Sequence, residues 1–495
     1  LPLHCSDGNG WIKSRTGEDT LDINLVTPPW ENPDPTLSHL EPADAVVDLP
    51  PRHIMDEYSA RYSRDAFRST FPVVDPILLR HTVEETYNQL PRRSDCEEHA
   101  RATRIAAKAC LQGFLSFMSV LLRTRRLTPV DADSLAASSR VLLSQVADHG
   151  SILVAQAAMT QALYLEFNGR SHAASVYRGM AVRTLFQLGA HLLPTAGFDV
   201  DIPATATIAL HRRHLRSLFW MAYTFDKDFA LRTGQPPLIH DDNCDLTLPE
   251  GYLDRPPDKS CAMPRPRPTA VSSARLDMLL PGDLRLDLLK SETYTMLYSA
   301  KAMRKSEVQL LQDIRELDTK LETWRMGIDP LLRPRLTYPA GYMFDLGQRM
   351  HHIMITLQYH HLISRIHGAT GRCRHLSTDE GLSAAFASSM ALAVEASRST
   401  LHFIQGLDQD LLGGPFWVVL FYPLSAIHVL FCDILTNPSE PAAMGDLRLL
   451  EATPVLVKNM RNMYLKDSEV EQLARVERFV AELVRLGHKA VARAR

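Results

Sequence analysis

LRSLFWMAYTFDKDFALRTGQPPLIHDDNCDLTLP, residues 215–249, is the stretch that decides the fold. Phe219, Tyr223 and Asp226 stand at i, i+4 and i+7, so they share one face of a predicted helix. The aromatic side chains are expected to pack inward, while the carboxylate reaches a neighbouring base. Gly234 is expected to relieve the backbone where the helix ends. The stretch therefore predicts a buried aromatic helix with a sharp exit.

The loop after this helix contains DDNCD, residues 241–245, which matches the DDxxD string of Asp241, Asp242 and Asp245. In all-helical terpene synthases and prenyltransferases such a string binds magnesium and diphosphate. Here Pro236 and the residues after it do not continue a regular helix, and no second metal-binding cluster is recognisable downstream. Short Asp and Asn side chains accept hydrogen bonds from backbone donors in turns. We therefore interpret these acids as loop architecture and expect no metal.

Composition excludes several classes of protein. The chain has 495 residues, of which 45% are hydrophobic and 22% are charged, as in globular proteins. Its net charge of −3 leaves no basic excess to neutralise a nucleic acid backbone. The seven cysteines are scattered and form no CxxC pair, which favours a reducing intracellular compartment. No apolar run approaches the roughly 20 residues that span a bilayer, so we expect a soluble protein without a membrane anchor.

The periodicity beyond residue 51 is helical, and alternating β-branched runs are nearly absent. We predict an all-α domain of roughly 15–20 helices in two packed halves, with no significant sheet. Asp75-Pro76 is typical of a helix start, and Asn168-Gly169 of a left-handed helix end. The longer predicted helices cover residues 96–122, 131–147, 156–167, 171–188, 308–324, 342–366, 382–403, 416–435, 446–463 and 468–492.

Four segments divide the chain. Residues 1–50 are rich in Pro, Asp, Gly and Asn and predict a mostly irregular N-terminal arm. Residues 51–249 and 276–495 are the two helical halves. Residues 250–275, where prolines alternate with arginines, predict a mobile connection between them.

Histidine pairs at 351–352 and 360–361 raise the question of a metal site. They lie on a predicted helix without a carboxylate at HExxH spacing, so packing is the favoured interpretation. The candidate pocket consists of polar and aromatic positions: Trp220, Tyr223, His351, His352, Tyr359 and His360.

No short catalytic motif is present. GxSxG, GxGxxG, GxxxxGKS/T and HExxH are all missing, and no nucleophile can be assigned. A cyclase or isomerase that acts by shape and one or two general acids leaves no such motif, so an enzyme remains an alternative.

The region from Arg212 to Pro249 resembles the fungal-specific transcription factor domain, the middle homology region of fungal zinc-cluster regulators. The similarity extends over most of the chain from about Pro50. Its motif residues here are Arg212, Arg213, Phe219, Trp220, Tyr223, Asp226, Gly234, Pro236, Asp241 and Pro249.

This resemblance implies a regulatory, effector-sensing domain that controls an attached DNA reader. Its expected partners are a small-molecule effector and regulatory proteins, with DNA bound only through an N-terminal module that this chain lacks. If that module exists, the native protein holds two zinc ions, is a homodimer and resides in the nucleus. Without it, the protein is cytoplasmic and acts as an enzyme or as a co-regulator that does not bind DNA.

Two expectations concern arginines. Arg212, Arg213 and Arg216 are expected to form buried ion pairs that tie helices together. Gln235 and Lys227 stand where the family usually has arginine, which implies that a local ion pair is lost.

Overall fold

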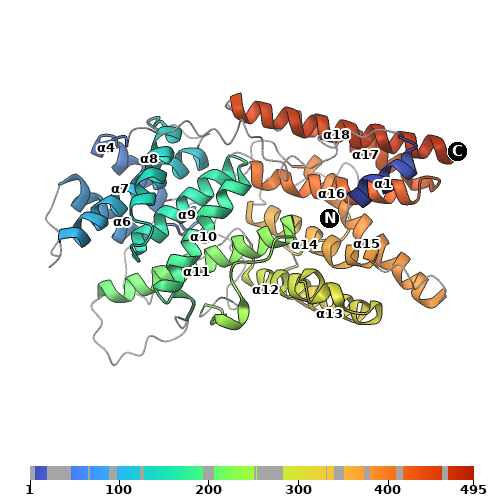
Figure 1. The fold of residues 1–495 in the computed structure, drawn as a ribbon, viewed down its shortest axis with the longest axis horizontal. Helices are drawn as coiled ribbons and strands as arrows, with labels where there is room; N and C mark the ends of the chain where they lie inside the picture. The colour runs from blue at the N-terminus through green and yellow to red at the C-terminus, as the bar shows by residue number, and fades with distance from the viewer. Residues whose placement is uncertain are drawn as a thin grey trace.

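The computed structural model describes residues 6–18, 46–64, 67–88, 97–122, 127–192, 206–249, 252, 282–330, 332–338, 350–372, 380–407, 416–459 and 467–495. These residues contain helices and no β-strand, which confirms the predicted all-α class (Figure 1). The α-helices are α1 Ser6–Thr16, α4 Arg52–Arg64, α5 Phe67–Thr70, α6 Pro76–Tyr87, α7 Glu97–Leu121, α8 Ala132–Gln145, α9 Ile152–Phe167, α10 Ser171–Gln187, α11 Ala206–Thr233, α12 Leu284–Thr293, α13 Glu307–Met326, α14 Met350–Gly368, α15 Glu380–Gln405, α16 Phe416–Thr436, α17 Pro441–Asn459 and α18 Asp467–Ala494.

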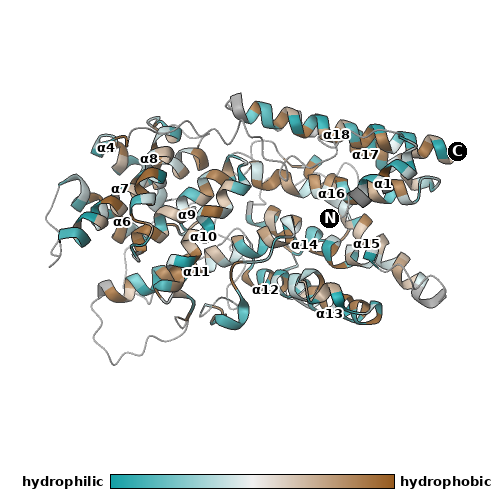
Figure 2. Cartoon of the chain, viewed as in Figure 1, coloured by the Kyte–Doolittle hydropathy of each residue, from teal (hydrophilic) through white to brown (hydrophobic). Residues whose placement is uncertain are grey.

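Helices α4 to α10 gather at one end of the molecule and α12 to α18 at the other, with α11 between them (Figure 1). One large hydrophobic core draws side chains from both groups, and a smaller one joins the end of α11 to α12, α13 and α14. Hydrophobic and hydrophilic positions alternate along most helices, as expected of helices with one face in a core (Figure 2). The two halves of the sequence therefore share a core, which places α11 at the centre of the structure.

The turn between α9 and α10 is the predicted left-handed helix end. Gly169 has φ 73°, where a residue with a Cβ atom is strained. The Gln472 side-chain amide of α18 donates a hydrogen bond of 2.9 Å to the Gly169 carbonyl. A Cβ atom at Gly169 would lie 2.6 Å from Gln472 Nε2. The absence of a side chain here allows α18 to approach the hairpin closely.

Other predicted helix starts are also confirmed. Asp75 caps α6 by accepting hydrogen bonds from the amides of Ile77 and Leu78, with Pro76 in the first turn. Asp131 caps α8 in the same way. From sequence, the proline after Asp75 predicted the first start, and the second lies at the beginning of the helix predicted over residues 131–147.

The N-terminal arm is more ordered than predicted. Residues 6–16 form α1, whose Ile12 side chain is 1% exposed in the main core. Arg493, near the end of α18, donates to the Ser14 carbonyl at 3.1 Å. The irregular-arm prediction is therefore wrong for α1, while residues 19–45 lie outside the described residues.

The proline-rich connection predicted over residues 250–275 lies outside the described residues except for Tyr252. The Tyr252 hydroxyl accepts a hydrogen bond of 2.9 Å from the Leu284 amide, at the start of α12.

The expectation that no apolar run is long enough for a membrane span was wrong. Helices α7 and α16 are both long and apolar enough by composition. In each, 78% of the apolar window is buried inside the protein, as in core helices. Their hydrophobicity is thus used in packing.

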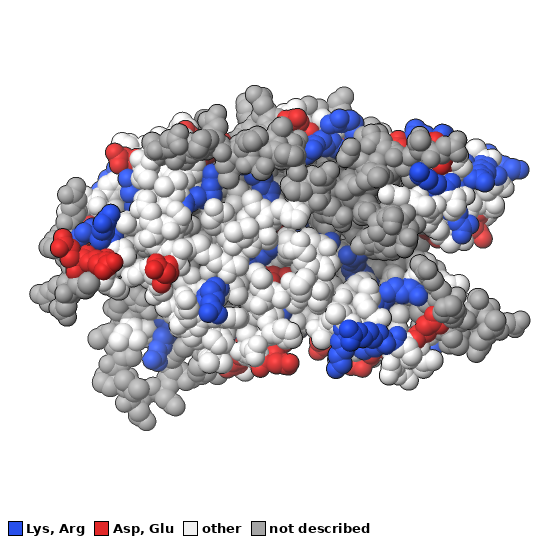
Figure 3. Space-filling model, viewed as in Figure 1, with Lys and Arg blue, Asp and Glu red and all other residues white. Residues whose placement is uncertain are grey.

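On the face shown in Figure 3, Lys and Arg side chains are interspersed with Asp and Glu over the described residues. No continuous basic surface forms on that part of the face, which agrees with the nearly balanced charge of the sequence.

Candidate functional site

The loop that leaves α11 is fastened to the helix by two adjacent buried side chains. Asp226, 2% exposed, accepts hydrogen bonds from the amides of Leu238 at 2.8 Å and Ile239 at 3.0 Å. Lys227, 1% exposed, donates to the Ile239 carbonyl and lies 3.1 Å from Asp241 Oδ1. Asp226 was expected to pair with a neighbouring basic side chain. The basic group in contact with it is the amine of Lys227, 3.8 Å from Asp226 Oδ2. Because its main partners are backbone amides, Asp226 serves chiefly to hold the loop.

The acidic loop residues have separate protein partners. Asp241 Oδ1 accepts a hydrogen bond of 3.1 Å from the Tyr223 hydroxyl in addition to its ion pair with Lys227. Asp245 Oδ1 accepts from the Thr247 amide at 2.8 Å. Among the described residues, no group of three His, Cys, Asp or Glu side chains is arranged to hold a metal. The bonds of Asp241 and Asp245 support the architectural interpretation of this loop.

Among the described residues, Arg216 is buried and forms no ion pair with a carboxylate. Its side chain is 2% exposed and donates to the carbonyls of Ala190, at 3.3 Å, and Asp245. The guanidinium lies 4.7 Å from the Phe219 ring centroid and 5.0 Å from that of Trp220. Burial lowers the pKa of Arg216 to about 10. The expected buried ion pair is therefore replaced by carbonyl and aromatic contacts.

The other arginine expectations also need correction. Arg212 is exposed, and Arg213, with a side chain 34% exposed, reaches Asp75 only at 4.0 Å. The predicted loss of an ion pair at Lys227 is wrong, since Lys227 pairs with Asp241 at 3.1 Å. A lysine at this position still ties α11 to the loop.

A second buried charge network joins α11, α12 and α16. Asp228 lies 2.6 Å from Arg232 and 3.3 Å from Lys290, which also pairs with Asp287 at 2.9 Å. The Tyr422 hydroxyl accepts from Arg232 at 2.9 Å and donates to Asp228 at 3.4 Å. Burial alone would raise the pKa of Asp228, but the Arg232 and Lys290 cations lower it below its ordinary value. Asp228 is thus held as a carboxylate between two cations.

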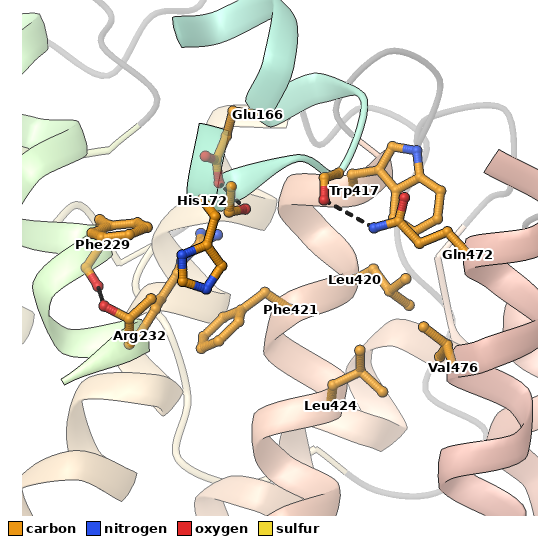
Figure 4. A pocket seen from close by; sticks show the side chains of 13 residues that line it. Glu166, His172, Phe229, Arg232, Trp417, Leu420, Phe421, Leu424, Gln472 and Val476 are labelled. Carbon is orange, nitrogen blue, oxygen red and sulfur yellow. Dashed lines mark hydrogen bonds between the residues drawn. The ribbon is translucent and has the colours of Figure 1, made fainter. Parts of the chain in front are cut away.

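Beside this network lies a pocket where the α9–α10 turn and the end of α11 meet α16 and α18 (Figure 4). Its volume is about 60 Å³, which is room for several waters or a small chemical group. Its walls are mostly apolar and aromatic, with polar side chains among them. The lining residues are Glu166, Gly169, Ser171, His172, Phe229, Arg232, Thr233, Trp417, Leu420, Phe421, Leu424, Gln472 and Val476.

The polar side of the pocket contains an incompletely bonded carboxylate. Glu166 Oε1 accepts a hydrogen bond of 3.1 Å from the Ser171 hydroxyl. Its other oxygen, Oε2, is buried and has no hydrogen-bond partner among the described residues. Arg232 faces the same space and is already paired with Asp228. A buried acceptor without a donor is costly, so this oxygen is a weakly satisfied group at the edge of the pocket.

A smaller cavity of about 10 Å³ lies between α14, α15 and α16, lined by polar groups that include His360, His361 and Tyr422. His361 Nε2 has no partner among the described residues, and burial holds its pKa well below the ordinary value. The space fits one water molecule. Tyr422 also bonds Arg232, so it connects this cavity to the pocket through the charge network.

Of the six candidate pocket residues from sequence, His360 lines the small cavity and none lines the larger pocket. His360 bonds the Arg335 carbonyl at 2.7 Å, and burial lowers its pKa to about 4. Tyr359 stacks on Trp324 with ring centroids 6.2 Å apart.

Trp220 and Tyr223 pack against each other in the main core, with ring centroids 5.5 Å apart. His352 is buried, and burial with the neighbouring His351 lowers its pKa to about 4. His351 is half-buried. The structure thus places the α11 aromatics and the α14 histidines in packing environments, and it assembles the pocket from other residues.

Sequence reasoning missed Glu166, Phe229, Arg232 and Trp417. One signal was available: Asp228 and Arg232 are spaced i, i+4 on the same helix, which predicts a charge pair.

Residues 132–326 match the family model of the fungal specific transcription factor domain. This range begins with α8, ends with α13 and contains the motif of α11 and its loop. Residues 132–326 form a fungal specific transcription factor domain. The pocket therefore has α9, α10 and α11 inside this domain, and α16 and α18 beyond it.

The relatives that the chain resembles are described as transcription factors. The chain is 26% identical to an ABC-transporter-regulating transcription factor of Aspergillus fumigatus, over 97% of this chain and 52% of that protein. It is 26% identical to the protein of the same description in Aspergillus oryzae, over 88% and 47%. It is 24% identical to the Fusaridione A cluster transcription factor of Fusarium heterosporum, over 63% and 55%.

The chain spans about half the length of these relatives. No solved structure matches it significantly. The domain and the relatives support a regulatory role, and neither supports the enzyme alternative.

Proposed function

We propose that this chain is the regulatory, effector-sensing body of a fungal transcription factor, and that the pocket beside Glu166 is where it senses a small molecule. The observation that carries this proposal is the location of the pocket. Its walls come from the matched domain on one side and from α16 and α18 on the other. A molecule bound there touches both parts at once, so its binding energy can bias their packing.

The buried charge network connects the pocket to the packing of three helices. Arg232 lines the pocket and bonds Asp228 and Tyr422, while Asp228 also pairs with Lys290 of α12. A shift of the Arg232 side chain on ligand binding would change partners on α11, α12 and α16 together. Coupling through such discrete contacts is a physical basis for regulation.

DNA binding, two zinc ions, a homodimer and a nuclear location belong to this proposal for the whole protein. The family match and relatives described as transcription factors, whose length is about twice the part that this chain matches, support DNA binding and a nuclear location. The two zinc ions and the homodimer are proposed on the resemblance alone. The balanced charge of the chain favours a separate DNA reader.

A reporter assay tests the proposed role. Residues 1–495 are fused to a DNA reader without regulatory activity of its own and expressed in yeast with a matching reporter gene. Expression is expected to differ several-fold from that with the reader fused to an unrelated helical protein of similar size. Equal expression from both fusions, at equal protein levels, would refute a regulatory role.

A further inference from the structure

Most polar side chains that line the pocket are already hydrogen-bonded within the protein. The bonds run from the Ser171 hydroxyl to Glu166 Oε1 at 3.1 Å, from the Thr233 hydroxyl to the Phe229 carbonyl at 2.9 Å, from the Gln472 amide to the Gly169 carbonyl at 2.9 Å and from the Trp417 indole to Glu469 at 3.1 Å. The first three are drawn in Figure 4. These donors are therefore committed to the protein itself.

The charged groups of the lining are committed as well. Arg232 is paired with Asp228 at 2.6 Å and donates to the Tyr422 hydroxyl at 2.9 Å. Glu166 Oε2 has no partner among the described residues, but it is buried with almost no surface that a ligand could touch. His172 is exposed, so water outside the pocket solvates it. The described lining thus offers a bound molecule no strong polar anchor inside the pocket.

The wall that remains for contact is apolar. Phe229 comes from α11, Leu420, Phe421 and Leu424 from α16, and Val476 from α18 (Figure 4). A buried water is well held only where about two to four polar partners surround it. Water in this space is therefore weakly held, and an apolar group that displaces it gains affinity.

The volume limits the size of that group. An apolar cavity of about 150 Å³ accommodates benzene. By proportion, the space of about 60 Å³ takes about two or three carbons. This is enough for the end of a straight aliphatic chain and too little for a ring or a tert-butyl group. Because His172 is exposed at the pocket wall, the remainder of a longer molecule leaves the pocket there.

We propose that the pocket is a subsite for the narrow aliphatic end of an effector, with the straight chain end packed on Phe229, Leu424 and Val476 and the polar part outside, near His172. This inference rests on the proposed sensing role and specifies the ligand class of that site.

The test uses three alcohols with the same number of carbons: n-butanol, tert-butanol and the butanediol that has a hydroxyl at each end of a straight chain. Binding to the full chain is followed by NMR of protein labelled at Leu and Val methyl groups, which places reporters at Leu420, Leu424 and Val476. n-Butanol is expected to shift these signals with a dissociation constant in the millimolar range, because so small a group buries little surface.

The other two alcohols are expected to bind about tenfold or more weakly. tert-Butanol is too wide for the space, and either end of the butanediol would bury a hydroxyl against a wall without a free partner. Binding of either alcohol as tightly as n-butanol, or no shift of the pocket methyl signals with n-butanol, would overturn the proposal.

A pair of variants locates the binding. Val476→Ala widens the pocket and is expected to strengthen tert-butanol binding about tenfold, with Leu420 and Leu424 as reporters. Val480→Ala is the matched control, because Val480 is one turn further along α18, is 1% exposed and does not line the pocket. It should leave the binding of both butanols unchanged. Circular dichroism verifies that each variant is folded.

The same effect from both variants would mean that the alcohols bind elsewhere, which contradicts the proposal. The reporter assay does not depend on the alcohols. A regulatory fusion whose pocket does not bind n-butanol would refute the ligand class alone, whereas an inactive fusion that binds n-butanol in the pocket would refute the regulatory role alone.

Discussion

Replacing Lys290 with methionine is expected to destabilise the protein by about 3–5 kcal/mol, the cost of leaving a buried charge without its partner. The Lys290 side chain is 1% exposed and pairs with Asp287 at 2.9 Å and Asp228 at 3.3 Å. Burial disfavours the charged amine, but these carboxylates more than offset it and raise the pKa of Lys290. Asp228 keeps Arg232 at 2.6 Å in the variant. Asp287 is 0% exposed and, among the described residues, keeps only the Thr224 hydroxyl at 2.8 Å, so most of the cost arises there.

A second substitution tests this assignment. Adding Asp287→Leu to Lys290→Met removes the orphaned carboxylate, and more than half of the lost stability is expected to return. Lys320→Met is the matched control, because Lys320 also contacts two carboxylates, Glu292 and Glu316, but is 40% exposed. Its expected cost is about 0–1 kcal/mol. Urea denaturation followed by tryptophan fluorescence and circular dichroism measures all three, and equal costs for Lys290→Met and Lys320→Met would refute the reasoning.

Three further predictions concern pH, backbone and metal. Burial lowers the pKa of His360 from 6.5 to about 4, so the unfolded chain takes up a proton before the folded protein does as pH falls. The contribution of His360 to stability is fully present above pH 6.5 and should decline by roughly 3 kcal/mol towards pH 4. Burial also lowers the pKa of His352 and His361, so His360→Gln should remove only its own share of the acid decline in a pH series of denaturation curves. Gly169→Ala should destabilise the protein by about 1–2 kcal/mol, because Gly169 has a φ of 73°. Gly445→Ala should stabilise the protein by about 0.5–1 kcal/mol, because Gly445 lies within α17 and nothing lies near its Cβ position. Thermal melts that give the two variants the same change in stability would contradict this. Asp241→Asn should lower the free energy of unfolding by about 2 kcal/mol, because it weakens the ion pair with Lys227. EDTA should leave the melting temperature of the parent protein unchanged. A fall in melting temperature with EDTA that magnesium reverses would show that the loop binds metal.

Local features of the fold were predictable because their causes are local. Asp75-Pro76 and Asp131 begin helices, and Asn168-Gly169 ends one, since the residues that satisfy the terminal backbone groups lie within the same turn. Helix α1 was missed because its apolar periodicity is weak, and it is held by α18 at the other end of the chain.

The pocket was not predictable for the opposite reason. Its walls come from segments near residues 169, 231, 420 and 474, and the hydrogen bond between Tyr422 and Arg232 joins positions 190 apart in sequence. The sequence of one helix does not indicate which side chain of a distant helix will contact it. The aromatic and histidine positions chosen from sequence were conspicuous by residue type. Glu166 lines the pocket, but in sequence it is an ordinary acid, and its second oxygen has no donor among the described residues.

The pocket is lined by residues on both sides of residue 326, where the family match ends, and this has a practical consequence for work on this protein. A fragment trimmed to the family boundaries, 132–326, would lose α16 and α18, and Phe229 would face solvent instead of Phe421 and Leu424. Such a fragment would be prone to aggregate, and a failed ligand screen on it would carry no information about the intact chain. Screening and crystallisation should therefore keep everything through Arg495, even though the recognisable domain stops far earlier.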